Sequence, residues 1–169
     1  PVFTELLGNT LVPVATVPAT ARTSVNFAFG GATAAGTSTL PPSMAVQLGL
    51  YQARGVTAAK TDLFTVLFGA NDMIPVLSAP ATATNPAGID VAGASAAATV
   101  AGGVQTLIGL GAKNIVVGGL PNLGVTPRSI AAGSTGAAFG LRATNAFNNE
   151  LTNRLRTLAG TAARTPHPC

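Results

Sequence analysis

The sequence predicts an α/β fold, in which helices pack against a parallel β-sheet. Two apolar runs rich in strand-forming residues, 62–68 and 114–117, each lead into a glycine-rich turn. Segments of helical periodicity lie between and after these runs, and the clearest of them covers 139–158. Strands that alternate with helices along the chain are typical of α/β proteins.

The first half of the chain contains one predicted strand and one predicted long helix. We expect a helical turn at Phe3–Leu7, followed by a loop at Asn9–Thr23, where Pro13 and Pro18 exclude a central strand. A strand is expected at Ser24–Phe29 and ends at Gly30–Gly31. The next helix is capped by Ser43, runs to Arg54 and ends at Gly55.

The second half continues the alternation. Residues Asp62–Phe68 are expected to form a strand buried on both faces, broken at Gly69–Asp72 and followed by an Ala/Thr-rich loop with Pro75, Pro80 and Pro86. Asp90 can cap a helix that ends at Gly109 or Gly111, and Asn114–Val117 is a third buried strand. The last helix has an apolar face made of Phe139, Ala143, Phe147, Leu151, Leu155 and Leu158.

The length and composition predict a single domain over residues 1–169. Only 8% of the residues are charged, while 20 Gly and 12 Pro argue against a coiled coil, a charged disordered tail or a long helical bundle. The nine basic residues are dispersed and the chain has no Trp and one Tyr. Nucleic-acid binding needs a basic cluster with stacking aromatics, so we expect no nucleic-acid partner.

A membrane span, a metal and a disulfide are also not expected. The uncharged stretch between Asp90 and Lys113 is long enough to cross a bilayer, but its large apolar residues group on one helical stripe, which favours a core helix. The chain has one cysteine, Cys169, and one histidine, His167. Neither a disulfide within the chain nor an ordinary metal site can be built from them, and we predict no cofactor.

Candidate site residues lie where the strands end. In open α/β sheets ligands bind beyond the carboxyl ends of the strands, which here are Gly30–Gly31, Gly69–Asp72 and Gly118–Pro121. Tight turns alone would explain the two glycine pairs. Asn71 and Asp72 are different, because two adjacent polar residues directly after an apolar strand need hydrogen-bond partners there.

Two other segments match known motifs only in part. Residues 31–38 have the glycine spacing of a phosphate-binding loop, but Thr37 stands where the lysine belongs, and no G-x-G-x-x-G follows a strand. Residues 93–97 approach a nucleophile elbow, with Ala97 in place of the second glycine. Ser95 falls inside a predicted helix there, and we interpret it as an ordinary helix serine.

Taken in order, the strand-end segments resemble the SGNH (GDSL-type) hydrolase family. Asn26–Thr33 resembles the family's second block, Val66–Asp72 resembles its G-x-N-D block, and residues 111–117 with 120–124 resemble the strand and turn that follow. The resemblance implies a three-layer α/β/α fold with a parallel, flavodoxin-like sheet in the order 2-1-3-4-5. The members most similar in style are bacterial secreted, autotransporter-type and plant lipase-like proteins, which implies a secreted, cell-surface or periplasmic location.

The resemblance also implies a chemistry. In this family a serine, activated by a histidine that an aspartate orients, attacks an ester, and the oxyanion is bound by the serine N–H, a glycine N–H and an asparagine side chain. Gly31 and Asn71 would be two of the three oxyanion donors, and Asp72 would organise the turn. The implied partner is a small ester or lipid substrate, whose alcohol and acyl parts the sequence leaves open, as it does the oligomeric state.

The chain departs from the family pattern at both ends. The G-D-S block is absent and would lie before Pro1, and no serine here has that context. The D-x-x-H block is also absent, because Arg164 stands three residues before His167, although His167–Pro168 resembles its end. The first and last strands of the sheet are therefore expected to be missing. The chain would be a partial domain and inactive by itself.

Three functions stay open at this point. The chain is an ester hydrolase whose active parts lie beyond its ends, a non-catalytic binding or structural relative, or a nucleotide-binding domain, which the missing lysine disfavours. The hydrolase interpretation makes two structural predictions. The Gly31 N–H and the Asn71 side chain should share a cleft away from His167, and a gap one strand wide should separate 24–29 from 62–68.

Overall fold

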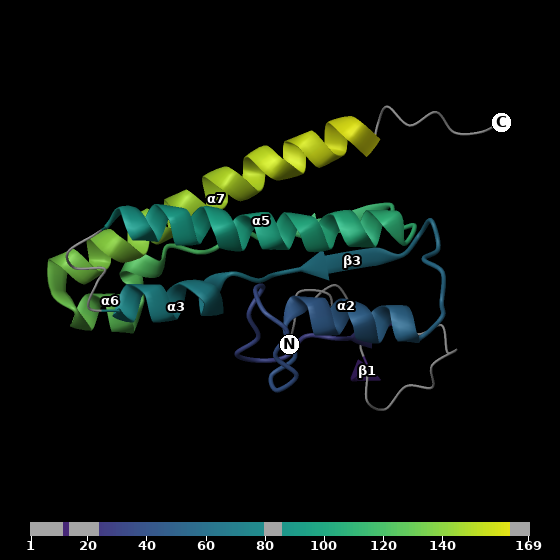
Figure 1. Ribbon diagram of the computed structural model, residues 1–169, viewed down its shortest axis with the longest axis horizontal. Helices are drawn as coiled ribbons and strands as arrows, with labels where there is room; N and C mark the ends of the chain where they lie inside the picture. The colour runs from purple at the N-terminus through teal and green to yellow at the C-terminus, as the bar shows by residue number, and fades with distance from the viewer. Residues whose placement is uncertain (1–11, 14–23, 80–85, 163–169) are drawn as a thin grey trace.

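The computed structural model describes residues 12–13, 24–79 and 86–162. The elements in chain order are β1 (Val12–Pro13), β2 (Val25–Asn26), α2 (Met44–Ala53), β3 (Leu63–Val66), α3 (Ala70–Ser78), α5 (Ala87–Gly109), β4 (Asn114–Val117), η2 (Leu123–Val125), α6 (Pro127–Ala131) and α7 (Gly133–Ala162). Figure 1 shows α5 running along β3, with α7 on the far side of α5. The α/β class predicted from the sequence is confirmed.

The described strands form two separate parallel pairs. β3 pairs with β4 from Leu63↔Asn114 to Val66↔Val117, so the strand predicted at 114–117 is confirmed residue for residue. β2 pairs with β1 instead, and no described strand pairs with both β2 and β3. The expected interruption between these two strands is therefore present in the described part of the chain.

Two predictions about the first strands need correction. Val12–Pro13 is a strand rather than loop, because a two-residue strand at the margin of a sheet tolerates a proline. The strand predicted at 24–29 covers only Val25–Asn26. The Asn26 side chain accepts a hydrogen bond from the Ala28 N–H at 2.9 Å, which turns the backbone away from the ladder. The helical turn predicted at Phe3–Leu7 lies outside the described residues.

The prediction that β3 and β4 are buried on both faces is wrong. Phe64 and Val66 point toward the helices, and the Phe64 ring meets Tyr51 of α2 edge to face at a centroid distance of 5.4 Å. On the opposite face Leu63, Leu67 and Val116 are 46, 68 and 47% exposed. Their apolar character was correctly identified, but no described element covers that face.

The segment after β3 is a helix, not the loop that its proline suggested. α3 begins at Ala70 and continues through Pro75 to Ser78. Met73 is completely buried and Val76 and Leu77 pack against the core, so tertiary contacts outweigh the hydrogen bond that Pro75 cannot donate. The residues from Pro80 to 85 lie outside the described part.

The helix ends also differ slightly from the predicted ones. Ser43 is the N-cap residue of α2 as expected, but its hydroxyl makes no capping bond and is buried without a hydrogen-bond partner among the described residues. α5 begins at Ala87, which places Asp90 in its first turn rather than at its cap. α2 stops before Gly55, where φ is +62°, and α7 is longer than predicted, from Gly133 to Ala162.

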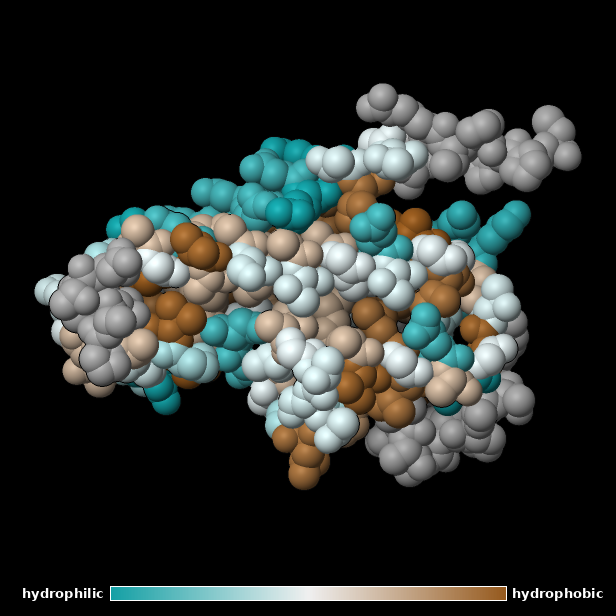
Figure 2. All heavy atoms as spheres, in the orientation of Figure 1, coloured by the Kyte–Doolittle hydropathy of each residue, from teal (hydrophilic) through white to brown (hydrophobic). Residues whose placement is uncertain are grey.

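The core lies between α5, α7 and the helix-facing side of β3 and β4. Phe147, Ala143 and Leu151 of α7 are buried there, as the period of the last helix predicts. α5 is long and apolar enough to cross a membrane by length and composition, a property that core helices share. Its Val100, Val104 and Leu107 are buried within the protein. Figure 2 shows hydrophilic side chains along α7 and hydrophobic ones over α2 and β3.

Candidate functional site

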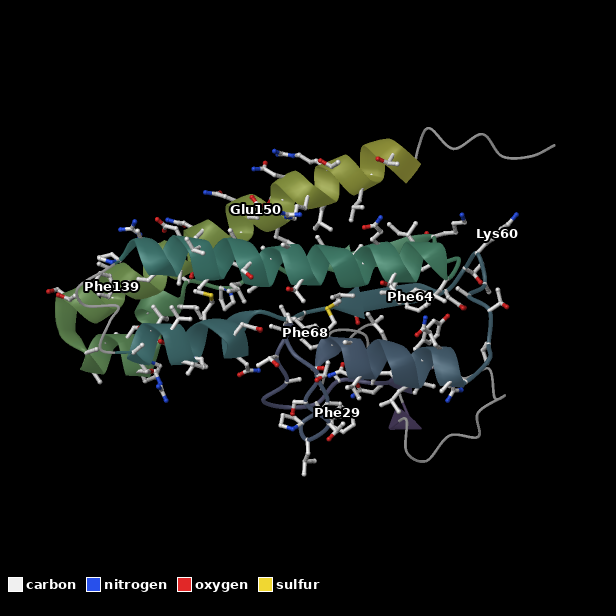
Figure 3. The ribbon with its side chains drawn as sticks, in the orientation of Figure 1. Phe29, Lys60, Phe64, Phe68, Phe139 and Glu150 are labelled. Atoms are coloured by element: carbon white, nitrogen blue, oxygen red, sulfur yellow. The ribbon has the colours of Figure 1, made fainter. Side chains whose placement is uncertain are left out.

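The loop that begins at Gly31 and the first turn of α3 are joined by hydrogen bonds. The Asn71 Nδ2 donates to the Ala32 carbonyl oxygen at 2.8 Å. The Asp72 carboxylate accepts from the Ala34 N–H at 2.8 Å and from the Ala35 N–H at 2.9 Å. In Figure 3 this region lies between the labelled Phe68, at the end of β3, and Phe29, just before the loop. The two polar residues thus have the partners that the sequence requires.

The two Asp72 bonds bear directly on the phosphate-loop pattern at 31–38. A phosphate-binding loop needs backbone N–H groups free to surround an anion. Here the Ala34 and Ala35 N–H groups already bind the protein's own carboxylate, whose negative charge would repel a phosphate. The geometry therefore argues against a nucleotide site in this loop.

Gly69 determines where Asn71 begins its helix. It is the N-cap residue of α3 with φ +114°, a conformation that glycine adopts without a steric penalty. A Cβ on Gly69 would also collide with the Phe147 ring of α7. The close contact of a bare backbone with an aromatic ring brings α3, and with it Asn71, against the core.

Gly31 sits in a turn with its backbone N–H available. Its φ is +78°, and the turn is closed by a hydrogen bond from the Ala32 N–H to the Phe29 carbonyl oxygen at 3.3 Å. Among the described residues none accepts a hydrogen bond from the Gly31 N–H. Pro41 covers the turn, since its Cγ would lie 3.5 Å from a Cβ placed on Gly31. Gly31 thus directly precedes the residue whose carbonyl oxygen Asn71 binds.

A cleft of about 400 Å³ opens beside Asn71. It lies between the loop, α3 and α5, and its lining residues are Thr33, Ala35, Gly36, Asn71, Asp72, Pro75, Ala92, Ser95 and Ala96. Gly31 is not in this lining. The prediction that Gly31 and Asn71 share a cleft is therefore wrong for this cleft, which Asn71 lines together with the later part of the loop.

Sequence reasoning did not identify Ser95 as a residue of this cleft. Its place inside a helix was predicted correctly, because α5 covers Ala87–Gly109. Ala92 and Ala96, three residues before and one after it, also line the cleft. A run of small residues on one helix side is the signal that could have indicated a close approach of α3.

The turn after β4 is held by two side chains of α7. Asn148 accepts from the Leu120 N–H at 2.8 Å and donates to the Leu120 carbonyl oxygen at 2.9 Å. The buried Thr144 hydroxyl accepts from the Leu123 N–H at 2.9 Å. The predicted turn at 120–124 is thereby fixed to the same helix that packs on Gly69.

The remaining residues with possible chemistry either lie outside the described residues or have partners elsewhere. His167, Arg164 and Cys169 lie outside the described residues, so the prediction that His167 is remote from Asn71 stays a prediction. Ser78 is engaged elsewhere, since it donates to the Ile74 carbonyl oxygen and accepts from Arg128. Over residues 24–79 and 86–162 there is no cluster of three His, Cys, Asp or Glu side chains suited to a metal ion.

One ion pair of the described part lies on the outer surface of the helices. Arg142 of α7 donates through Nε to Asp90 Oδ1 at 2.8 Å and through a terminal nitrogen to Oδ2 at 2.6 Å. These hydrogen bonds lower the pKa of Asp90 from its usual value of 3.8. The pair joins α5 to α7 and is remote in sequence from Gly31 and Asn71.

Comparison with known proteins identifies the family. No curated protein matches the sequence. The family model of the GDSL-like lipases and acylhydrolases, in contrast, matches residues 3–167, nearly the whole chain. This match covers both the loop at Gly31 and the G-x-N-D turn at Asn71. The chain therefore belongs to the GDSL-like lipase/acylhydrolase family.

Proposed function

We propose that this chain supplies the oxyanion-binding part of a serine ester hydrolase. The family suggests a hydrolase that acts on esters. The observation that carries the proposal is the hydrogen bond from Asn71 Nδ2 to the Ala32 carbonyl oxygen, because it holds the asparagine beside the loop that begins with Gly31.

The hydrogen-bond capacity of Asn71 supports this role. An amide nitrogen carries two hydrogens, and the Ala32 carbonyl uses one of them. The second hydrogen and the Gly31 N–H are two donors available to an oxyanion. As a serine attacks the ester carbon, the carbonyl oxygen gains negative charge, and donors fixed in advance stabilise that charge without reorganising. Asp72 holds the loop through Ala34 and Ala35 and takes no part in the proton transfer.

The nucleophile and its base belong, in this proposal, to segments outside the 169 residues. No serine of the sequence stands in a G-D-S context, and no aspartate stands three residues before the single histidine. The proposed substrate is a small ester or lipid, and the proposed location is outside the cytoplasm, which fractionation of the producing cells would test.

The first test is substitution of Asn71 in the full-length gene product, in which the flanking segments would supply both the nucleophile and its base. Asn71→Ala should lower kcat for p-nitrophenyl butyrate by about 10²–10³-fold, with a smaller change in KM. The control is Asn149→Ala, an exposed asparagine of α7. Melting curves of both variants show whether the fold persists.

The outcome of this test separates the two remaining functions. A folded Asn71→Ala variant with unchanged kcat would contradict the oxyanion role. A complete protein with no esterase activity at all would favour a non-catalytic relative that binds without turnover.

The second test concerns the 169-residue chain by itself. It should hydrolyse p-nitrophenyl esters no faster than the buffer does, because a site without nucleophile and base retains only weak catalysis. A fluorophosphonate probe should leave its serines unlabelled. Stoichiometric labelling of any one serine, mapped by mass spectrometry, would contradict the proposal.

A further inference from the structure

An apolar tip projects from the loop that joins β2 to α2. The tip consists of Phe29, Leu40 and Pro41. Leu40 is 89% exposed, the largest exposed fraction among the large hydrophobic side chains of the described residues, and Phe29 is 40% exposed. Figure 2 shows a hydrophobic projection below α2, in the region where Figure 3 labels Phe29. Single exposed leucines are common on protein surfaces, so the surroundings of the tip decide what it does.

The turn at Gly31 brings the two segments of the tip together. The Ala32 N–H donates to the Phe29 carbonyl oxygen at 3.3 Å, which closes the turn. The Pro41 Cγ lies 3.5 Å from the place that a Cβ on Gly31 would occupy. Pro41 therefore packs on the turn that Phe29 begins, and Leu40 stands next to this contact in the chain.

The backbone of the tip is suited to an apolar medium. In hydrocarbon an unbonded backbone N–H group is costly. Thr39 pairs with Pro42 in an isolated antiparallel bridge. At its base the Ser43 N–H donates to the Ser38 carbonyl oxygen at 2.8 Å. Pro41 and Pro42 have no N–H group at all, so the tip presents carbon atoms and few donors that need water.

The tip is also free of charge. The sequence has no charged residue between Arg22 and Arg54. Asp72, which reaches the loop from α3, is bonded to the Ala34 and Ala35 N–H groups. A segment that binds anionic headgroups carries a cluster of Lys or Arg, which this stretch lacks. Any attraction of the tip to a partner must therefore come from its apolar area.

The size of the tip favours a lipid surface over a second protein. A stable protein interface buries about 800 Å² on each partner, from roughly 20–30 residues. Two side chains and one proline at a projecting point offer only a small part of that area. A lipid surface needs no complementary shape, and binding to it grows with the apolar area that is inserted.

We propose that the tip of Phe29, Leu40 and Pro41 inserts into the surface of a zwitterionic phospholipid bilayer. Because Pro41 packs on the turn at Gly31, insertion brings the loop that Asn71 binds to the lipid surface. The proposal goes beyond the proposed function and does not depend on it, since binding to lipid requires no turnover.

Tryptophan substitution tests where the chain meets the lipid, because the sequence has no Trp. In the 169-residue Leu40→Trp variant the emission should shift to the blue on addition of dioleoylphosphatidylcholine vesicles, and brominated acyl chains should quench it. The matched control is Val91→Trp. Val91 is also an exposed apolar residue, 70% exposed near the start of α5, and it is not part of the tip. The emission of this variant should change little.

Flotation with the same vesicles measures how much the tip contributes. Leu40→Ala should lower the partition coefficient by about 5–50-fold, because it removes most of the inserted side chain, whereas Val91→Ala should leave it within about twofold. Raising the salt concentration from about 0.05 to 0.5 M should not weaken the binding, since no charge takes part. Circular dichroism shows that each variant keeps its fold.

Three results would overturn the proposal. Equal quenching of the two tryptophan variants, or quenching of neither, would mean that the tip is not what contacts the lipid. Binding that requires anionic lipid and disappears at high salt would indicate adsorption of the whole chain, whose net charge is +4. Dimerisation that depends on Leu40 in place of vesicle binding, measured by sedimentation velocity, would make the tip a contact between two copies.

Discussion

At the scale of single residues, the clearest result is that Asn71 and Asp72 bind the loop of residues 32–35. The sequence alone indicated that these two residues need partners, since they follow an apolar strand. It also indicated Gly31 as a neighbour, through the family resemblance. Ser95 was predicted only as a helix residue. The small residues on its side of α5 indicate that another element can approach closely, but helical periodicity does not tell which element does so.

Gly69 offers a test of how α3 is positioned. Gly69→Ala should lower the free energy of unfolding by about 2–4 kcal/mol, because alanine is strained at φ +114° and its Cβ meets the Phe147 ring. Urea denaturation followed by circular dichroism measures this change.

Gly102→Ala is the control for this prediction. Gly102 lies inside α5 with open space around the position of a Cβ. The substitution should therefore stabilise the protein by about 0.5–1 kcal/mol. Equal stability of the Gly69 and Gly102 variants would mean that Phe147 moves aside at little cost.

At the scale of elements, the predictions succeeded where one pattern decides and failed where two effects compete. Asn114–Val117 and the apolar face of α7 follow from composition and period alone. α3 was predicted as loop because Pro75 counts against a helix, whereas burial of Met73 outweighs that local cost. Such tertiary burial is not visible in a local sequence window.

The ion pair between α5 and α7 predicts a pH dependence. The pKa of Asp90 is lower in the folded chain than its usual 3.8, so the pair stabilises the fold above that pH. The contribution is lost as the pH falls through the lowered pKa, where Asp90 becomes protonated in the folded state too. Arg142→Gln should therefore lower Tm near neutral pH, and this difference should shrink in acid below 3.8.

Arg156→Gln is the matched control, because it removes the same charge from an exposed position of α7 where no ion pair is formed with a described residue. Both partners of the Asp90–Arg142 pair are nearly half exposed, so the effect should be small. Thermal melts at several pH values give the comparison. An Arg142→Gln effect that persists unchanged in strong acid would exclude the carboxylate as its cause.

At the scale of the whole molecule, the described part covers only one face of β3 and β4. The α/β class and the alternation of β2, α2, β3, α5, β4 and α7 were predictable from the sequence patterns. The exposed face with Leu63, Leu67 and Val116 was not predictable. A run of apolar residues indicates that a strand should be covered, but it does not indicate which element covers it.

The exposed face and the unpaired strand margin predict a marginally stable chain. Unpaired backbone groups and apolar side chains at a sheet edge favour association between molecules. The 169-residue chain should therefore melt broadly and aggregate, and adding the upstream segment should raise Tm and sharpen the transition. A cooperative melt that the extension leaves unchanged would indicate an independently stable, differently connected domain.

Asn148 has a consequence for how α7 is oriented. Its planar amide forms two parallel hydrogen bonds with the N–H and carbonyl groups of Leu120, in the same way as a base pairs with its complement. A single hydrogen bond would act as a hinge, and an apolar contact would allow sliding. Two bonds from one rigid plane restrict both, so Asn148 limits the angles at which α7, thirty residues long, can cross the turn that follows β4.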